Sequence, residues 1–141
     1  MGKNITLTIE LSINASPDKV WDALTNPEIV KKYFFGTDLI CDWKEGSPII
    51  FKGVWDDKEY IDKGTILSLI PGELIKYNYL SSFSGLEDKL ENYANIVYAL
   101  SSVPEGTKLA VSQDNIPSEE ARAHSEANWK SVLNEMKKLI E

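Results

Sequence analysis

Apolar and polar residues alternate strictly near the start of the chain. Every second residue from Ile5 to Ile13 is aliphatic, and the residues between them are polar. Successive side chains of a β-strand point to opposite faces, so this pattern predicts a half-buried strand of unusual length over residues 3–15.

Two helix-start signals follow this strand. Ser16-Pro17 and Asn26-Pro27 each place a capping side chain before a proline, and proline is favoured at the first position of a helix. We therefore expect two short helices between residues 16 and 33.

The chain from Thr37 onwards has the pattern of a meander of antiparallel strands. Short runs of apolar and β-branched residues are separated by turn signals such as Pro71-Gly72 and Pro104-Glu105-Gly106. The expected strands cover residues 38–43, 48–52, 60–70, 74–81, 92–102 and 107–113.

The stretch 117–141 carries the longest helical pattern. Acidic residues follow Ser118 in the first turn and lysines lie in the last, an arrangement that suits the helix dipole. Large apolar side chains recur at helical spacing in its second half, at Trp129, Val132, Leu133, Met136 and Ile140.

The inward face of this last helix changes character along its length. At about 100° per residue, Ala121 and Ser125 lie on the same side as Trp129 and Val132. Small residues against a sheet leave space that bulky residues would fill. The pattern therefore favours a cavity beneath the first half of the helix, and the alternative is that another side chain, from a loop, fills the gap.

Residues 83–91 form a connection that is longer and more charged than a hairpin needs. Phe83, Leu86 and Leu90 would come together in a short helical turn folded over the open end of the sheet. Loops of this length often form a lid or a binding edge. A solvated connection is the alternative.

The order of these elements predicts an α+β fold with an antiparallel sheet, as one domain over residues 1–141. The 141 residues are 43% apolar and 26% charged, the balance of a soluble globular protein. A net charge of −7 argues against nucleic acid or an anionic membrane as a partner. There is neither a signal-peptide pattern nor an apolar run of the ~20 residues that a membrane helix needs, so we expect a cytoplasmic protein.

Few residues carry an evident chemistry of their own. Cys41 is the single cysteine, which excludes an internal disulfide, and we expect a buried and inert thiol. His124 falls outside the apolar stripe of the last helix and has no second ligand at metal-binding spacing. Phosphate-binding glycine loops and nucleophile elbows are missing. The sequence therefore predicts neither a metal nor a cofactor and assigns no catalytic residue.

Four stretches, taken with the order of the elements, carry a family resemblance over nearly the whole chain. They are ASPDKVWDALTNPE at residues 15–28, the strand with Gly64-Thr65-Ile66 that ends at Pro71, the hairpin Gly106-Thr107-Lys108-Leu109, and the closing Asn128-Trp129 with Val132-Leu133 and Leu139. They resemble the START-like (SRPBCC) superfamily and, more narrowly, the domain named for homologues of the activator of the heat-shock chaperone ATPase. The resemblance implies the helix-grip fold, in which a curved antiparallel sheet of about six or seven strands wraps around the long C-terminal helix.

Two local departures from the family lie near the expected pocket mouth. The family commonly has Trp at the position that is Tyr33 in this chain, where Phe34 follows it. The family also has a glycine-rich turn at the position where this chain has Gly46-Ser47-Pro48. The resemblance therefore does not specify the ligand. The eukaryotic chaperone activators also have a further, chaperone-binding domain, to which nothing in this chain corresponds.

The resemblance implies a pocket between the sheet and the long helix, in agreement with the cavity inferred from the helix pattern. Aromatic side chains offer large apolar area, and Tyr and Trp add a polar tip that can orient a ligand. Arg122, on the edge of the inward face, could hold a carboxylate or phosphate, and a structural salt bridge is the alternative. The candidate ligand-binding residues are Tyr33, Phe35, Phe51, Trp55, Tyr77, Tyr79, Tyr98, Arg122, Ser125 and Trp129.

These observations favour a domain that binds a small hydrophobic or amphipathic molecule without transforming it. One alternative is a cyclase- or dehydratase-type enzyme for an aromatic or polyketide-like substrate, with a pocket tyrosine and Arg122 as its polar groups. Another is a protein-interaction module that regulates a chaperone. We expect a monomer or a homodimer, and fold-level analogy alone does not decide among these functions.

Overall fold

The computed structural model describes residues 5–34, 36–55, 57–80, 87–116 and 118–141, without the side chains of Trp55 and Leu90. Phe35, Phe83 and Leu86, which the sequence singled out, lie outside the described residues. The described end of the 83–91 connection leads into a short 3-10 helix, η1 (Leu90–Asn92).

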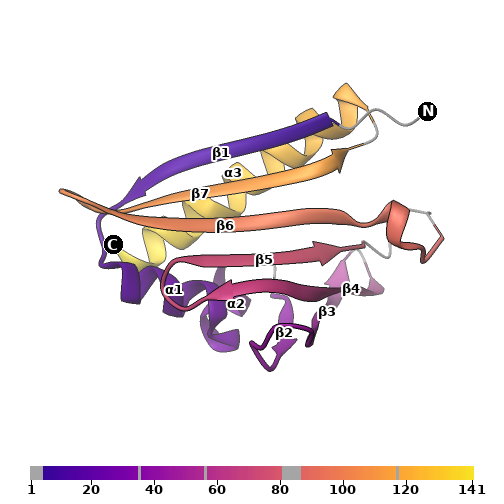
Figure 1. The fold of residues 1–141 in the computed structure, drawn as a ribbon, viewed down its shortest axis with the longest axis horizontal. Coiled ribbons are helices and arrows are strands. Elements are labelled where there is room, and N and C mark those ends of the chain that lie inside the picture. The colour runs from indigo at the N-terminus through magenta and orange to yellow at the C-terminus, as the bar shows by residue number, and fades with distance from the viewer. Residues whose placement is uncertain (1–4, 35, 56, 81–86, 117) are drawn as a thin grey trace.

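One antiparallel sheet of seven strands forms the body of the described chain, in the order β1-β7-β6-β5-β4-β3-β2 (Figure 1). The first and last strands are neighbours, and every other pair is consecutive in sequence. The strands are β1 (Ile5–Ile13), β2 (Asp38–Cys41), β3 (Pro48–Trp55), β4 (Lys58–Ile70), β5 (Leu74–Tyr79), β6 (Ala94–Val103) and β7 (Gly106–Ile116). This arrangement confirms the α+β helix-grip fold.

The helices begin at the capping residues that the sequence indicates. In α1 (Pro17–Thr25) the Ser16 hydroxyl accepts a hydrogen bond from the Lys19 amide, and in α2 (Pro27–Tyr33) the Asn26 side chain accepts one from the Glu28 amide. The long helix α3 (Glu119–Ile140) is capped in the same way by Ser118. Each side-chain oxygen satisfies an amide that has no partner within the helix.

The long helix runs along one face of the sheet, beside β1 and β7, and also contacts α1 and α2 (Figure 1). Its second half supplies Val132, Leu133, Met136 and Ile140 to the core, and all four are buried. Strand β1 alternates as predicted, with the side chains of Leu7 and Ile13 buried. The core therefore lies between the C-terminal half of α3 and the inward face of the sheet.

Several strand ends differ from the sequence expectation, and β7, for example, runs to Ile116 instead of residue 113. Strand β2 stops at Cys41, and Trp43 beyond it has a φ of 56°, which leaves the extended conformation. Strand β3 continues past Lys52 because it pairs with β4 as far as Trp55 opposite Lys58. This long-range pairing has no counterpart in the local pattern of apolar residues. None of the helices in the described part of the chain is long and apolar enough to cross a membrane.

Candidate functional site

The end of α2 is fixed against α1 by a buried tyrosine. The Tyr33 side chain is buried, and its hydroxyl donates to the Ala23 carbonyl oxygen at 2.8 Å. Phe34 follows as the C-cap residue of α2, and its amide donates to the Val30 carbonyl. The helix end therefore places two aromatic rings in succession over the sheet.

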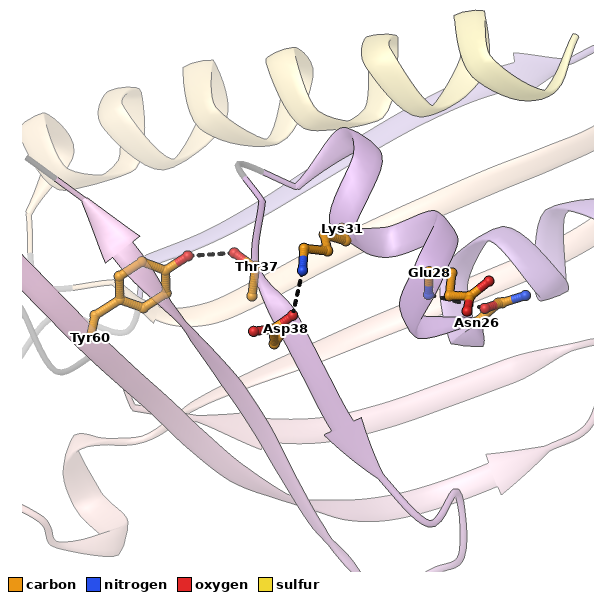
Figure 2. Close-up of polar contacts among 6 residues, drawn as sticks. All are labelled: Asn26, Glu28, Lys31, Thr37, Asp38 and Tyr60. Carbon is orange, nitrogen blue, oxygen red and sulfur yellow. Dashed lines mark hydrogen bonds and ion pairs between the residues drawn. The ribbon is translucent and has the colours of Figure 1, made fainter.

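Two polar contacts tie the chain after α2 to the sheet (Figure 2). Lys31 forms an ion pair with Asp38 at 3.2 Å between Nζ and Oδ1. The hydroxyl groups of Thr37 and Tyr60 form a buried hydrogen bond between this connection and β4. The ion pair links α2 to the start of β2, and the hydrogen bond links the connection between them to β4.

A continuous cluster of aromatic rings fills the space between these elements and α3. Phe34 stacks on Phe51 of β3 with ring centroids 5.8 Å apart, and Phe51 contacts Tyr77 of β5 at 6.0 Å. Trp129 of α3 meets Tyr98 of β6 edge-on at 6.0 Å. The members of this aromatic cluster are Tyr33, Phe34, Phe51, Tyr77, Tyr79, Tyr98 and Trp129.

Polar tips inside the cluster are paired with other groups. The hydroxyls of Tyr77 and Tyr98 lie 2.9 Å apart in a buried hydrogen bond. The Tyr79 hydroxyl donates to the Asp62 carboxylate at 2.6 Å. Trp129 is half-buried, and its Nε1 donates to the Gln113 side-chain oxygen at 2.9 Å.

Burial keeps the deep tyrosines neutral. Desolvation of the charged form raises the pKa of Tyr33, Tyr77 and Tyr98 well above the ordinary value. These hydroxyls therefore act as hydrogen-bond donors and acceptors at neutral pH, without charge.

A small cavity of about 10 Å³ lies within the cluster. That volume is of the order of one water molecule, so a larger ligand requires side chains to move. None of the described residues in the lining is charged, and they are Leu24, Val30, Tyr33, Phe34, Leu39, Trp43, Ile49, Phe51, Tyr77 and Tyr98.

Four of the ten candidate residues from the sequence line this cavity, namely Tyr33, Phe51, Tyr77 and Tyr98. Tyr79 and Trp129 belong to the aromatic cluster and contact lining residues through their rings. Phe35 and the Trp55 side chain lie outside the described residues.

None of the described residues that line this cavity comes from the first half of α3, beneath which the helix pattern predicted a space. Ser125 and Arg122 are half-buried, and Arg122 Nε donates to the Thr6 carbonyl oxygen of β1 at 3.1 Å. The guanidinium makes no ion pair with any acidic residue that the structure describes. Nearer the middle of α3, the Phe34 ring lies between Trp129 and Phe51.

Sequence reasoning missed Phe34 and Trp43 as lining residues. Trp43 lines the cavity with a φ of 56°, a left-handed conformation that bulky residues rarely adopt. Its position in an apparent strand gave no sign of this turn. The departure from the family pattern concerned Tyr33, the residue before Phe34, and did not single out Phe34 itself.

The Cys41 thiol and the possible metal ligands show no sign of a reactive site among the described residues. Cys41 is half-buried, its Sγ accepts a hydrogen bond from the Trp43 amide at 3.3 Å, and burial raises the thiol pKa. A protonated thiol is a poor nucleophile. Within the described ranges, no three His, Cys, Asp or Glu side chains are grouped so as to hold a metal ion.

Comparison with known proteins identifies relatives of the chain. The family model for Activator of Hsp90 ATPase homolog 1-like protein matches residues 14–141. The solution structure of ChR145 from Cytophaga hutchinsonii is similar, with 41% identity, a TM-score of 0.85, and coverage of 99% of this chain and 94% of that one. No protein of curated description matches the chain.

Two crystal structures at lower identity share the fold. Protein CV1439 from Chromobacterium violaceum has 21% identity and a TM-score of 0.82, with 96% of each chain covered. CalU16 from Micromonospora echinospora has 20% identity and a TM-score of 0.78, with 98% of this chain and 75% of that chain covered.

Proposed function

The chain belongs to the family of Activator of Hsp90 ATPase homolog 1-like proteins, and we propose that it binds a small hydrophobic or amphipathic molecule, without transforming it, within the aromatic cluster. Domains of this fold commonly bind hydrophobic ligands. The observation that carries the proposal is the cavity lined by uncharged rings and aliphatic side chains, with a tyrosine hydroxyl pair among them. Apolar walls with a few polar groups are the usual composition of a small-molecule site.

Binding requires the cavity to open, and Phe34 is the side chain placed to open it. Tyr33 beside it is buried and anchored to Ala23, whereas Phe34 is half-buried at the helix end. Gly36, two residues after Phe34, has a φ of +73°, a left-handed backbone conformation that favours glycine. A dry apolar cavity of ~150 Å³ admits benzene. Rotation of the Phe34 ring, itself of benzene size, would add space of that order.

The proposal is tested by what the protein retains and what stabilises it. We expect a small molecule to co-purify under native conditions, to be detected by native mass spectrometry, and to dissociate on unfolding. Hydrophobic compounds from a small library should raise the Tm by mass action. If nothing co-purifies and no compound raises the Tm, the proposal is wrong.

The same material separates the two alternatives. A dehydratase would release a product lighter by one water and a cyclase a product of altered structure, and chromatography with mass detection of the incubated mixture distinguishes both from the unreacted compound. A chaperone regulator would stimulate a chaperone's ATP hydrolysis without any small molecule. Saturable uptake of an unaltered compound is the result that supports binding alone.

A further inference from the structure

The hydroxyl pair within the aromatic cluster defines what kind of ligand the site would prefer. We propose that Tyr77 and Tyr98 together select molecules with a neutral hydrogen-bond acceptor, such as a ketone, ester or ether oxygen, over hydrocarbons and over carboxylates. This inference rests on the proposed function and adds the chemical class of the ligand.

The first step is a count of hydrogen-bond donors. Two tyrosine hydroxyls carry two protons, and the bond between Tyr77 and Tyr98 at 2.9 Å uses one of them. Neither hydroxyl donates to any other protein acceptor among the described residues. One proton of the pair therefore remains available, on whichever hydroxyl accepts.

The second step is where that proton lies. Both side chains are almost fully buried, with 2% and 6% of their surface exposed for Tyr77 and Tyr98 respectively. Both also line the cavity. A buried donor without an acceptor costs free energy, and a ligand acceptor placed in the cavity would recover it.

The register of the sheet holds the pair in place. Tyr77 lies opposite Ile96 and Tyr98 lies opposite Ile75, so the two tyrosines are diagonal neighbours on the inward face of β5 and β6. Their rings contact each other edge-on, with centroids 5.6 Å apart. The donor is therefore preorganised before any ligand enters.

The third step is charge. Among the residues that the structure describes, no cationic side chain lines the cavity, and Arg122 is bonded to the β1 backbone. A charged group that contacts the cluster is negative, because the Asp62 carboxylate accepts from Tyr79. An anion buried here would lose its hydration without gaining a partner, so a carboxylate should be disfavoured.

Three naphthalene probes of similar shape test the inference. They are 2-acetylnaphthalene, its isostere 2-isopropenylnaphthalene, in which CH₂ replaces the carbonyl oxygen, and 2-naphthoate. The quantity measured is the ratio of ketone to hydrocarbon Kd, followed from one protein variant to the next. Differences in transfer from water cancel in that comparison.

Tyr→Phe variants supply both the test and its control. In Tyr77→Phe/Tyr98→Phe the donor is gone, and we expect the preference for the ketone to fall by about three- to tenfold. Each single variant keeps one hydroxyl with a free proton and should lose less. Tyr60→Phe is the matched control, because that buried hydroxyl is hydrogen-bonded to Thr37 and Tyr60 is not among the described residues that line the cavity. It should leave the ratio unchanged.

A spectroscopic readout does not depend on the variants folding. In the wild-type protein the carbonyl stretch of bound 2-acetylnaphthalene should lie at lower wavenumber than in a hydrocarbon solvent, as a hydrogen-bonded carbonyl does. An unshifted stretch would overturn the inference.

The outcomes also separate this inference from the proposed function. The ketone and the hydrocarbon could both bind with the same ratio of their Kd values in wild type and in the double variant. In that case the site binds hydrophobic molecules, but the hydroxyl pair does not select for an acceptor. If 2-naphthoate binds more tightly than the ketone, the charge step is wrong. If no probe binds, both proposals fail.

Discussion

Phe34 and Trp129 meet edge to face, with ring centroids 6.4 Å apart and planes at 84°. One ring comes from the end of α2 and the other from α3, and Phe34 also stacks on Phe51 beneath it. Phe34 thus closes the space between the long helix and the sheet. In this arrangement the protein's own side chain stands where we propose that a ligand binds.

Phe34→Ala should therefore favour binding while it weakens the fold. Removal of a half-buried ring should cost about 1–3 kcal/mol of unfolding free energy, less than a fully buried Phe. Affinity for 2-acetylnaphthalene should rise about tenfold or more, because the ligand no longer has to displace a ring. Fluorescence titration measures the affinity, and Phe34→Leu, which refills most of the space, is the control. An unchanged Kd in Phe34→Ala would show that Phe34 does not gate the site.

Trp129→Ala should cost about 2–4 kcal/mol in a urea titration. The indole joins α3 to Tyr98 and Phe34, and its Nε1 donates to Gln113, so both packing and a hydrogen bond are lost. Lys130→Ala is the neighbouring control. That side chain makes only an exposed pair with Glu126 at 3.7 Å and should change stability by less than about 0.5 kcal/mol. A loss below about 1 kcal/mol for Trp129→Ala would mean that the ring contacts contribute little.

The buried tyrosines predict a fall in stability at alkaline pH. The pKa of Tyr33, Tyr77 and Tyr98 is raised in the folded state by burial. Above pH ~10 the unfolded chain loses these protons while the folded chain keeps them, so stability falls as pH rises, by up to about 1.4 kcal/mol per pH unit for each group. Urea titrations between pH 9 and 11.5 measure the slope. Tyr77→Phe should make it shallower, and an equal slope in both proteins would contradict this origin.

Gly64→Ala should be severely destabilising. A β-carbon at this position would lie 1.6 Å from the Asn78 carbonyl oxygen of β5, which forces the two strands apart. We expect a loss of about 3 kcal/mol or more. Gly46→Ala is the contrasting variant, with open space around the added carbon and a φ of +86°, and it should cost only about 1 kcal/mol. Similar losses for the two variants would contradict the close packing of β4 on β5.

The fold could be predicted from the sequence because its signals are local. Ser16-Pro17 and Asn26-Pro27 specify helix starts through their own side chains, and the alternation from Ile5 to Ile13 specifies which face is buried. The order of the elements, together with the family resemblance, predicted the helix-grip topology. These features need no knowledge of distant contacts.

The site was predictable only in part, for the opposite reason. Phe51, Tyr77 and Tyr98 were candidates as aromatic residues on strands, and all three line the cavity, as does Tyr33 at the end of α2. The role of Phe34 depends on how α2 ends over the sheet, and neither helix nor strand periodicity records that. The position of Arg122 on the helix predicted that its side chain would face the pocket. In the structure its Nε donates a hydrogen bond to the carbonyl oxygen of Thr6, a residue 116 positions away.

Isotope-edited NMR of the protein with bound 2-acetylnaphthalene tests the binding site most directly. Nuclear Overhauser contacts between protein and probe locate the ligand without relying on any variant. We expect contacts from the probe to the rings of Phe51, Tyr77 and Tyr98. Contacts confined to the exposed aliphatic side chains of Ile40, Val54 and Ile61 on β2, β3 and β4 would place the probe on the outside of the sheet and contradict the proposed site.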